Sequence, residues 1–83
     1  MKIKPGMILQ EEDGEAILFD PSSLLTAWLN ESGIIIWKRL LAGDDQATII
    51  KKFVSMYDVD RQEIVNDVQN IVNCFKTSGF IDS

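Results

Sequence analysis

The sequence has no histidine and a single cysteine, Cys74. Without histidine the chain lacks the commonest general base and the commonest ligand of transition metals. A lone cysteine cannot close a disulfide within the chain, and without a histidine it is a poor catalytic nucleophile or zinc ligand. There is also no glycine-rich phosphate loop. These absences predict a protein that is not an enzyme and needs no metal or cofactor, with Cys74 as a small, half-buried hydrophobic residue.

Positive charge is scarce as well, since 8 Lys and Arg face 13 Asp and Glu and the net charge is −5. An acidic surface repels the phosphates of nucleic acids and anionic membranes. No apolar run approaches the roughly 20 residues of a membrane-spanning helix. The first residues turn acidic before any signal-type apolar segment develops. We therefore expect a soluble, cytoplasmic protein that binds neither nucleic acid nor membrane.

The first third of the chain has the pattern of short strands joined by tight turns. Strands are expected at Met7 to Glu11, Ala16 to Asp20 and Leu24 to Asn30. The dipeptide Asp13-Gly14 is a hairpin signal, and Pro21 suits the second position of a turn. The three segments predict an antiparallel meander. At 83 residues, the whole chain (1–83) is expected to be one domain.

The apolar period changes to that of helices after Asn30. Helices are expected within residues 30–43, 44–58 and 58–79, each followed by a turn or a glycine. The candidate caps are Asn30 or Ser32 for the first, Asp44 or Asp45 for the second, and a capping box of Asp60 with Glu63 for the third. Buried stripes are expected at Ile34, Trp37, Leu40 and Leu41; at Ile49, Ile50, Phe53, Met56 and Tyr57; and at Ile64, Val68, Ile71, Val72 and Phe75. The order of elements predicts an α+β fold of the winged helix-turn-helix type, with a three-stranded antiparallel sheet before three helices.

The third expected strand is apolar on both of its alternating faces. One face carries Leu25, Ala27 and Leu29, which we assign to the core, and the other carries Leu24, Thr26 and Trp28. A small domain has one core and needs only one apolar face from such a strand. The second face is therefore a candidate binding surface.

Core and turn residues along the chain resemble those of the PqqD-like proteins, the leader-recognition domains of ribosomal peptide natural-product pathways (RiPP recognition elements). The likeness extends from about Lys4 to Ile81. Its marks are Leu29-Asn30, Gly33, Ile36, Leu40, Gly43, Ile50, Phe53, Tyr57, Val59-Asp60 and Gly79-Phe80-Ile81. The chain departs from many relatives in offering Asp44 or Asp45, rather than Ser or Thr, as the cap of the second helix.

This resemblance implies a binding module without catalytic activity. The leader of a precursor peptide would add to the third strand as an antiparallel strand, in a groove beside the third helix. Its partners would be the precursor leader, a separate leader peptidase and, as a further candidate, a cyclase, and the protein would be a monomer or a weak dimer. A small acidic domain is most similar to the stand-alone B-type protein of split lasso peptide pathways. The alternative is the PqqD of pyrroloquinoline quinone synthesis or of another radical-enzyme pathway.

An edge strand suits such binding because its unpaired N–H and C=O groups can pair with an extended peptide. Trp28 is either a residue at the rim of the core or an anchor of the groove, and we expect an anchor. On a helical wheel, one flank of the third helix carries Val65, Gln69, Val72 and Lys76, and the opposite flank carries Asp67 and Cys74. We expect the first flank to line the groove. The predicted peptide-binding residues are Leu24, Leu25, Thr26, Ala27, Trp28, Leu29, Val65, Val68, Gln69, Val72 and Lys76.

A winged-helix domain that binds DNA remains a remote alternative. The third helix offers Asn66, Gln69, Asn70 and Asn73, but only Arg61 and Lys76 carry positive charge. Recognition helices need cations for phosphates as well as amides for base edges. The acidic balance of the chain therefore disfavours this function.

Overall fold

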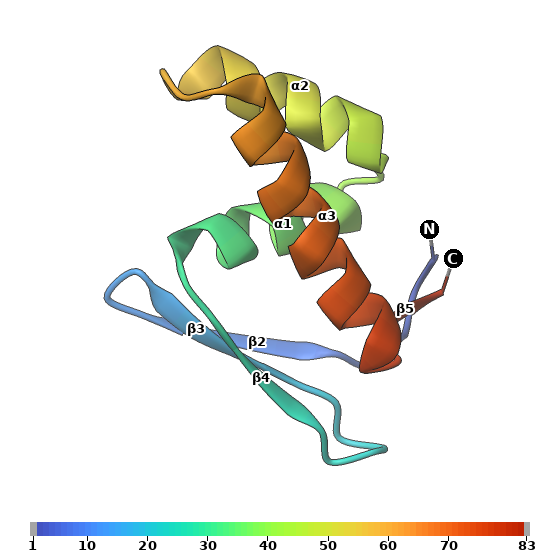
Figure 1. Cartoon of the computed structure of the whole chain (residues 1–83). Coiled ribbons are helices and arrows are strands. Elements are labelled where there is room, and N and C mark those ends of the chain that lie inside the picture. Colours follow the sequence, from blue (N-terminus) through green and yellow to red (C-terminus); the bar gives the residue numbers. More distant parts are fainter. Residues whose placement is uncertain (1, 83) are drawn as a thin grey trace.

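The computed structural model describes residues 2–82 and contains a three-stranded antiparallel sheet followed by three helices (Figure 1). The elements are β1 Lys2–Ile3, β2 Ile8–Glu12, β3 Glu15–Phe19, β4 Thr26–Leu29, α1 Glu31–Leu41, α2 Gln46–Met56, α3 Arg61–Thr77 and β5 Ile81–Asp82. The strand order β2-β3-β4 leaves β4 at one edge of the larger sheet. The α+β fold class and the order of its main elements are confirmed.

The helices cover one face of the sheet and bury its inward side chains (Figure 1). Leu18 on the central strand is fully buried, and its neighbours on this face are Leu9 and Ala27. Trp37 of α1 is 1% exposed and meets Phe75 of α3 edge to face, with 5.2 Å between ring centroids. Such contacts between large rings carry much of the packing energy of a small core.

The predicted buried stripes hold for most positions. Leu41, the last residue of α1, is 58% exposed, so its assignment to the core is wrong. On α3, the buried side chains are Ile64, Val68, Val72 and Phe75, whereas Ile71 is only partly covered. On α2, Met56 and Tyr57 are 62% and 38% exposed, so their assignment to the core is wrong. Met56 is the last residue of α2, and the backbone of Tyr57 after it is extended, so the helical spacing that predicted a buried stripe ends here.

The helix starts are fixed by side-chain caps in two of three cases. Asn30 accepts the N–H of Gly33 at 3.0 Å, and Asp45 accepts the N–H of Thr48 at 2.8 Å. Each bond satisfies a backbone donor that has no partner within its helix. The capping box predicted for α3 is wrong, because the side chain of its N-cap Asp60 makes no capping hydrogen bond.

The turn between β3 and β4 is organised around the buried carboxylate of Asp20, which is 1% exposed. Its two oxygens accept hydrogen bonds from the Lys4 ammonium at 2.6 Å, the Ser23 hydroxyl at 2.7 Å, and the hydroxyl and N–H of Ser22 at 2.9 and 3.0 Å. A buried charge is tolerated when it is paired and fully hydrogen-bonded in this way. The turn is thereby held in one conformation.

Because of this turn, β4, the third strand of the prediction, begins at Thr26 rather than at the predicted Leu24. Leu24 has a φ of 65°, a left-handed conformation that cannot continue a strand. Leu24 and Leu25 are 73% and 48% exposed. The assignment of Leu25 to the core face is therefore wrong, although Ala27 and Leu29 do face the helices.

Two short strands, β1 and β5, pair with each other and bring the two ends of the described chain together. Lys2 lies opposite Asp82, and Ile3 lies opposite Ile81. The sequence pattern did not predict this ladder, since two residues are too few to show an alternation. The expected packing of the tail on the core is confirmed, because Phe80 and Ile81 are 0% and 3% exposed.

We predict that Asp20→Asn lowers the melting temperature at pH 7 by several degrees. Hydrogen bonds from Lys4 and Ser23, the largest contributions, hold the pKa of Asp20 far below its usual value. Stability from this carboxylate is complete above the unfolded-state pKa of about 4 and is lost as the pH falls toward the lowered folded-state pKa. The difference in melting temperature between the two proteins should therefore shrink as the pH is lowered from 7 to 2. A constant difference would contradict this account.

Candidate functional site

The outer edge of β4 offers unpaired backbone groups in a defined pattern. The N–H of Asp20 donates to the carbonyl of Leu25 at 3.0 Å, just before the register Phe19↔Thr26 begins. In an antiparallel ladder, residues that bond to the neighbouring strand alternate with residues that do not. Ala27 and Leu29 therefore bond toward β3, while the N–H and C=O groups of Thr26 and Trp28 point to the open edge. No strand within residues 2–82 covers that edge.

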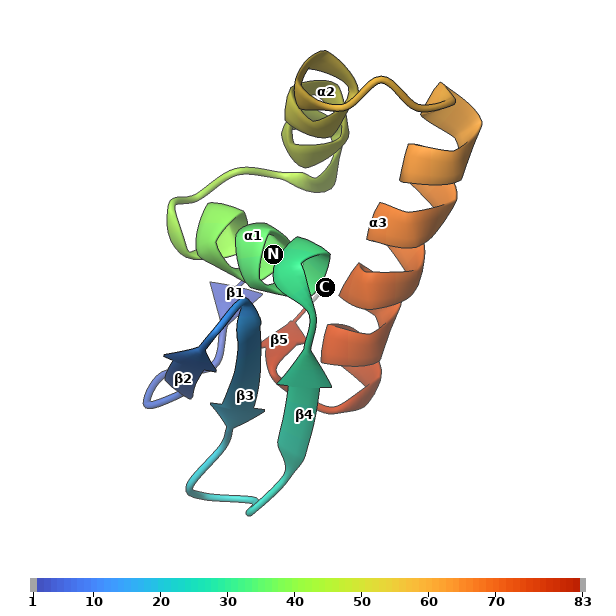
Figure 2. The same ribbon diagram turned by 90° about the vertical axis from the view of Figure 1, so that its left-hand side faces the viewer.

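A cleft of about 350 Å³ separates this edge from α3 (Figure 2 shows β4 and α3 side by side). The lining residues are Ala27, Trp28, Leu29, Asn30, Gly33, Asn70, Ile71, Cys74, Phe75 and Ser78. None of these side chains is an acidic or basic one. The cleft can thus hold apolar side chains beneath the strand edge, with amide and hydroxyl groups for hydrogen bonds.

The flank of α3 that faces β4 is the one opposite to our prediction. None of the five helix residues predicted to line the groove lines this cleft. Val68 and Val72 are 1% and 0% exposed and belong to the core. Val65, Gln69 and Lys76 also lie away from the cleft. The direction in which α3 crosses the sheet decides the flank, and a helical wheel carries no information about that direction.

The residues that α3 does contribute were not predicted: Asn70, Ile71, Cys74, Phe75 and Ser78. Cys74 is exposed in the cleft rather than half-buried, which corrects the expectation for its side chain. The helical wheel already placed Cys74 on the flank opposite Val65, and this was the one sequence signal that could have indicated its place in the cleft. Ile71 is partly exposed because it packs against the core on one side and lines the cleft on the other.

The four residues of β4 were predicted, and their side chains divide between two environments. Ala27 and Leu29 point to the helices and form the wall of the cleft. Trp28 borders the cleft at the edge, but it is 63% exposed and pairs with Ile17, itself 45% exposed, on the face away from the helices. Trp28 is therefore not part of the core. Leu24 and Leu25 precede the strand and lie outside the cleft.

The junction between β4 and α1 shapes one end of the cleft. Asn30 caps α1 directly after the strand, so the chain turns without a linker. A Cβ atom on Gly33 would lie 3.2 Å from the Cβ of Leu29, closer than ordinary packing allows. Glycine here lets the first turn of the helix lie against the end of the strand. The segment LNESG thus joins the strand edge to the helix layer.

The pKa of Asp45 is lowered by the hydrogen bonds from Thr48, but this helix cap lies outside the cleft. Residues 2–82 contain no group of three acidic, cysteine or histidine side chains able to hold a metal ion. In the same part of the chain, none of the helices has the length and apolar character needed to cross a membrane. What the cleft does offer is backbone hydrogen bonding and apolar contact.

Comparisons with known proteins give a family and a fold. The sequence profile of coenzyme PQQ synthesis protein D (PqqD) matches residues 8–81. The structure of TbiB1 in complex with the TbiA(beta) leader peptide aligns with a TM-score of 0.88 at 22% identity, over 100% of this chain and 96% of that chain. Lasso peptide synthetase B1 complexed with the leader peptide aligns with a TM-score of 0.84 at 26% identity, over 99% and 96%. A search of curated protein sequences gives no match.

We predict that Cys74 reacts with one equivalent of a maleimide in the folded protein, because its side chain is exposed in the cleft. Mass spectrometry of the native protein should show a single adduct, and Cys74→Ser should show none. A reaction that starts only when denaturant is added would mean that the cleft is closed in solution.

Proposed function

The chain belongs to the PqqD family, and we propose that it is a non-catalytic module that binds the leader segment of a ribosomally made precursor peptide. The observation that carries this proposal is the open edge of β4 above an uncharged cleft. An extended peptide that adds to such an edge gains backbone hydrogen bonds regardless of its sequence. Pockets under alternate side chains then provide the selectivity.

The bound leader runs antiparallel to β4 in this proposal. The N–H and C=O groups of Thr26 and Trp28 supply the hydrogen bonds, and alternate leader side chains enter the cleft against Ala27, Ile71 and Cys74. The intervening leader side chains lie beside the exposed indole of Trp28. Leu24 and Leu25 would contact a longer leader that continues past the start of the strand.

We further propose that the pathway is lasso peptide biosynthesis, with delivery of the precursor to a separate leader peptidase and cyclase in the cytoplasm. The support for this pathway is that both similar structures are leader complexes and that one of them is a lasso peptide synthetase B1. The family description favours a second candidate, a PqqD-type peptide chaperone for pyrroloquinoline quinone or another radical-enzyme pathway. The enzymes encoded beside the gene distinguish the two.

The direct experiment is calorimetric titration of the chain with synthetic leaders from short reading frames that neighbour its gene. Saturable binding with one-to-one stoichiometry is expected for the cognate leader, and binding should protect Cys74 from the maleimide. A scrambled leader of the same composition is the control. If no leader binds, the proposed function is wrong.

We predict that Thr26→Pro weakens leader binding about 5- to 30-fold, or 1–2 kcal/mol, because proline removes an edge N–H and its ring projects toward the guest. Proline is tolerated on edge strands, so the domain should remain folded. The matched control is Thr26→Val, which keeps the N–H and the shape of the side chain. Equal affinities for the two variants, measured at matched circular dichroism spectra, would exclude strand addition at this edge.

A further inference from the structure

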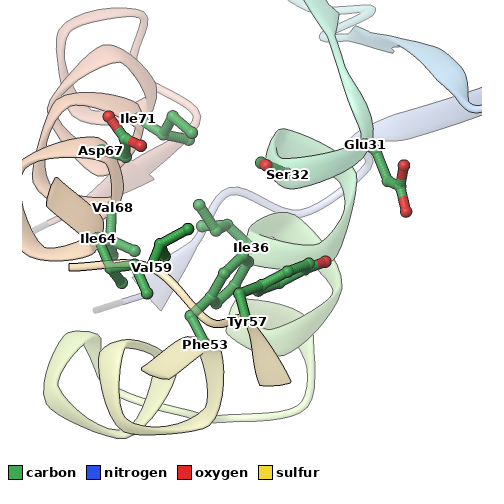
Figure 3. Close-up of a pocket in the computed structure, with 10 residues that line it drawn as sticks. All are labelled: Glu31, Ser32, Ile36, Phe53, Tyr57, Val59, Ile64, Asp67, Val68 and Ile71. Atoms are coloured by element: carbon green, nitrogen blue, oxygen red, sulfur yellow. The ribbon is translucent and has the colours of Figure 1, made fainter. Parts of the chain in front are cut away.

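A second hollow lies between the three helices, above the end of the β4 cleft, and we name it the helical cavity (Figure 3). Its volume is about 270 Å³. Its apolar wall consists of Ile36 from α1, Phe53 and Tyr57 at the end of α2, Val59 from the following turn, and Ile64, Val68 and Ile71 from α3. In Figure 3 the side chains of Ile36, Phe53 and Val59 point toward one another across this space.

The wall includes side chains that folding leaves partly in solvent. Val59 is 51% exposed and Tyr57 is 38% exposed, although both lie beside fully apolar neighbours. Tyr57 stacks on Phe53 with 5.5 Å between ring centroids, which holds its ring at the edge of the cavity. These residues therefore present an ordered apolar surface that the domain does not bury for itself.

The helical cavity and the β4 cleft adjoin each other on α3. Ile71 lines both hollows, and Asn30 at the end of the cleft is followed directly by Glu31 and Ser32 at the edge of the cavity. Along α3, the cavity lies toward the N-terminal half and the cleft toward the C-terminal half. The two hollows, which we together call the groove along α3, thus follow a single side of this helix past the point where β4 ends.

We propose that the helical cavity receives one large apolar side chain of the same peptide that pairs with β4, on the N-terminal side of the paired segment. This inference rests on the proposed function. A strand antiparallel to β4 passes Leu29 before it reaches Thr26, so the residues that precede the paired segment meet the helical cavity first. Val68 in the cavity and Cys74 in the cleft are six residues apart on α3, a rise of about 9 Å that an extended peptide spans in about three residues.

The volume of the helical cavity and the charges at its mouth favour a single apolar side chain as the occupant. A volume of about 270 Å³ lies just below the range of roughly 300–1,000 Å³ typical of small-molecule sites, so it suits a single side chain better than a cofactor. The charged residues at the mouth are Glu31 and Asp67, and no lysine or arginine lines the cavity within the described part of the chain. Acidic neighbours disfavour a carboxylate on the guest and favour a basic residue next to its apolar side chain.

The test uses random peptides displayed on phage and selected on the immobilised wild-type chain, with counter-selection on Thr26→Pro. Selected peptides should share a large apolar residue about three positions before the segment that pairs with β4. Alanine at that position should weaken binding to the wild-type chain by roughly tenfold or more, as expected for the loss of a buried large side chain.

A double-mutant cycle then locates that side chain. Val59→Asp places a charge in the wall of the cavity, and the matched control Met56→Asp places one at the same end of α2, at a 62% exposed residue outside the cavity. The alanine effect should disappear in Val59→Asp and persist in Met56→Asp. Amide chemical shifts of Tyr57 and Val59 should move with the wild-type peptide and not with its alanine variant, which gives a readout that needs no protein variant.

Each result bears on one proposal or on both. If peptides bind at the β4 edge but the alanine effect is absent, or is equal in the two aspartate variants, the inference about the cavity is overturned and strand addition stands. If the amide shifts of Tyr57 and Val59 depend instead on a peptide residue that follows the paired segment, the proposed direction of the peptide along β4 is wrong. If selection retains no peptide that depends on Thr26, both the inference and the proposed function fail.

Discussion

The buried carboxylate of Asp20 sets the hydrogen-bonding phase of β4, on which the rest of the site depends. By closing the turn with Lys4, Ser22 and Ser23, it fixes where the strand begins. A shift of one residue would exchange the two faces of the strand and turn the edge groups of Thr26 and Trp28 toward β3. One buried charge in a turn therefore determines which backbone groups are free at the opposite side of the strand.

The candidate binding surface depends on a second constraint, which is the way α3 lies against the sheet. Its core stripe packs on Trp37 and on the sheet, and this leaves one flank beside β4 and the other in solvent. Because Asn30 and Gly33 let α1 start directly after β4, the strand edge and the helix layer share one continuous wall.

Much of this fold could be predicted from the sequence, because its elements follow local rules. The hairpin at Asp13-Gly14, the caps at Asn30 and Asp45 and the helix end at Gly43 each depend on residues close in the chain. The edge strand itself was identified from its two apolar faces. Three features were missed because each depends on contacts between segments far apart in sequence. They are the flank of α3 that faces β4, the start of β4 at Thr26, and the pairing of β1 with β5. Lys4 and Asp20, for example, are separated by 16 positions and show no pattern that links them.

The antiparallel pairing of Lys2 with Asp82 places the two ends of the described chain next to each other, which matters for fusion to other polypeptides. The described chain enters and leaves at neighbouring points (Figure 1), and the hollow beside these strands shares no lining residue with the β4 cleft or the helical cavity. A protein fused at either end would therefore be joined through nearly the same position, and both fusions would leave the groove along α3 accessible. Both ends of the described chain thus share one side of the structure, apart from the groove along α3.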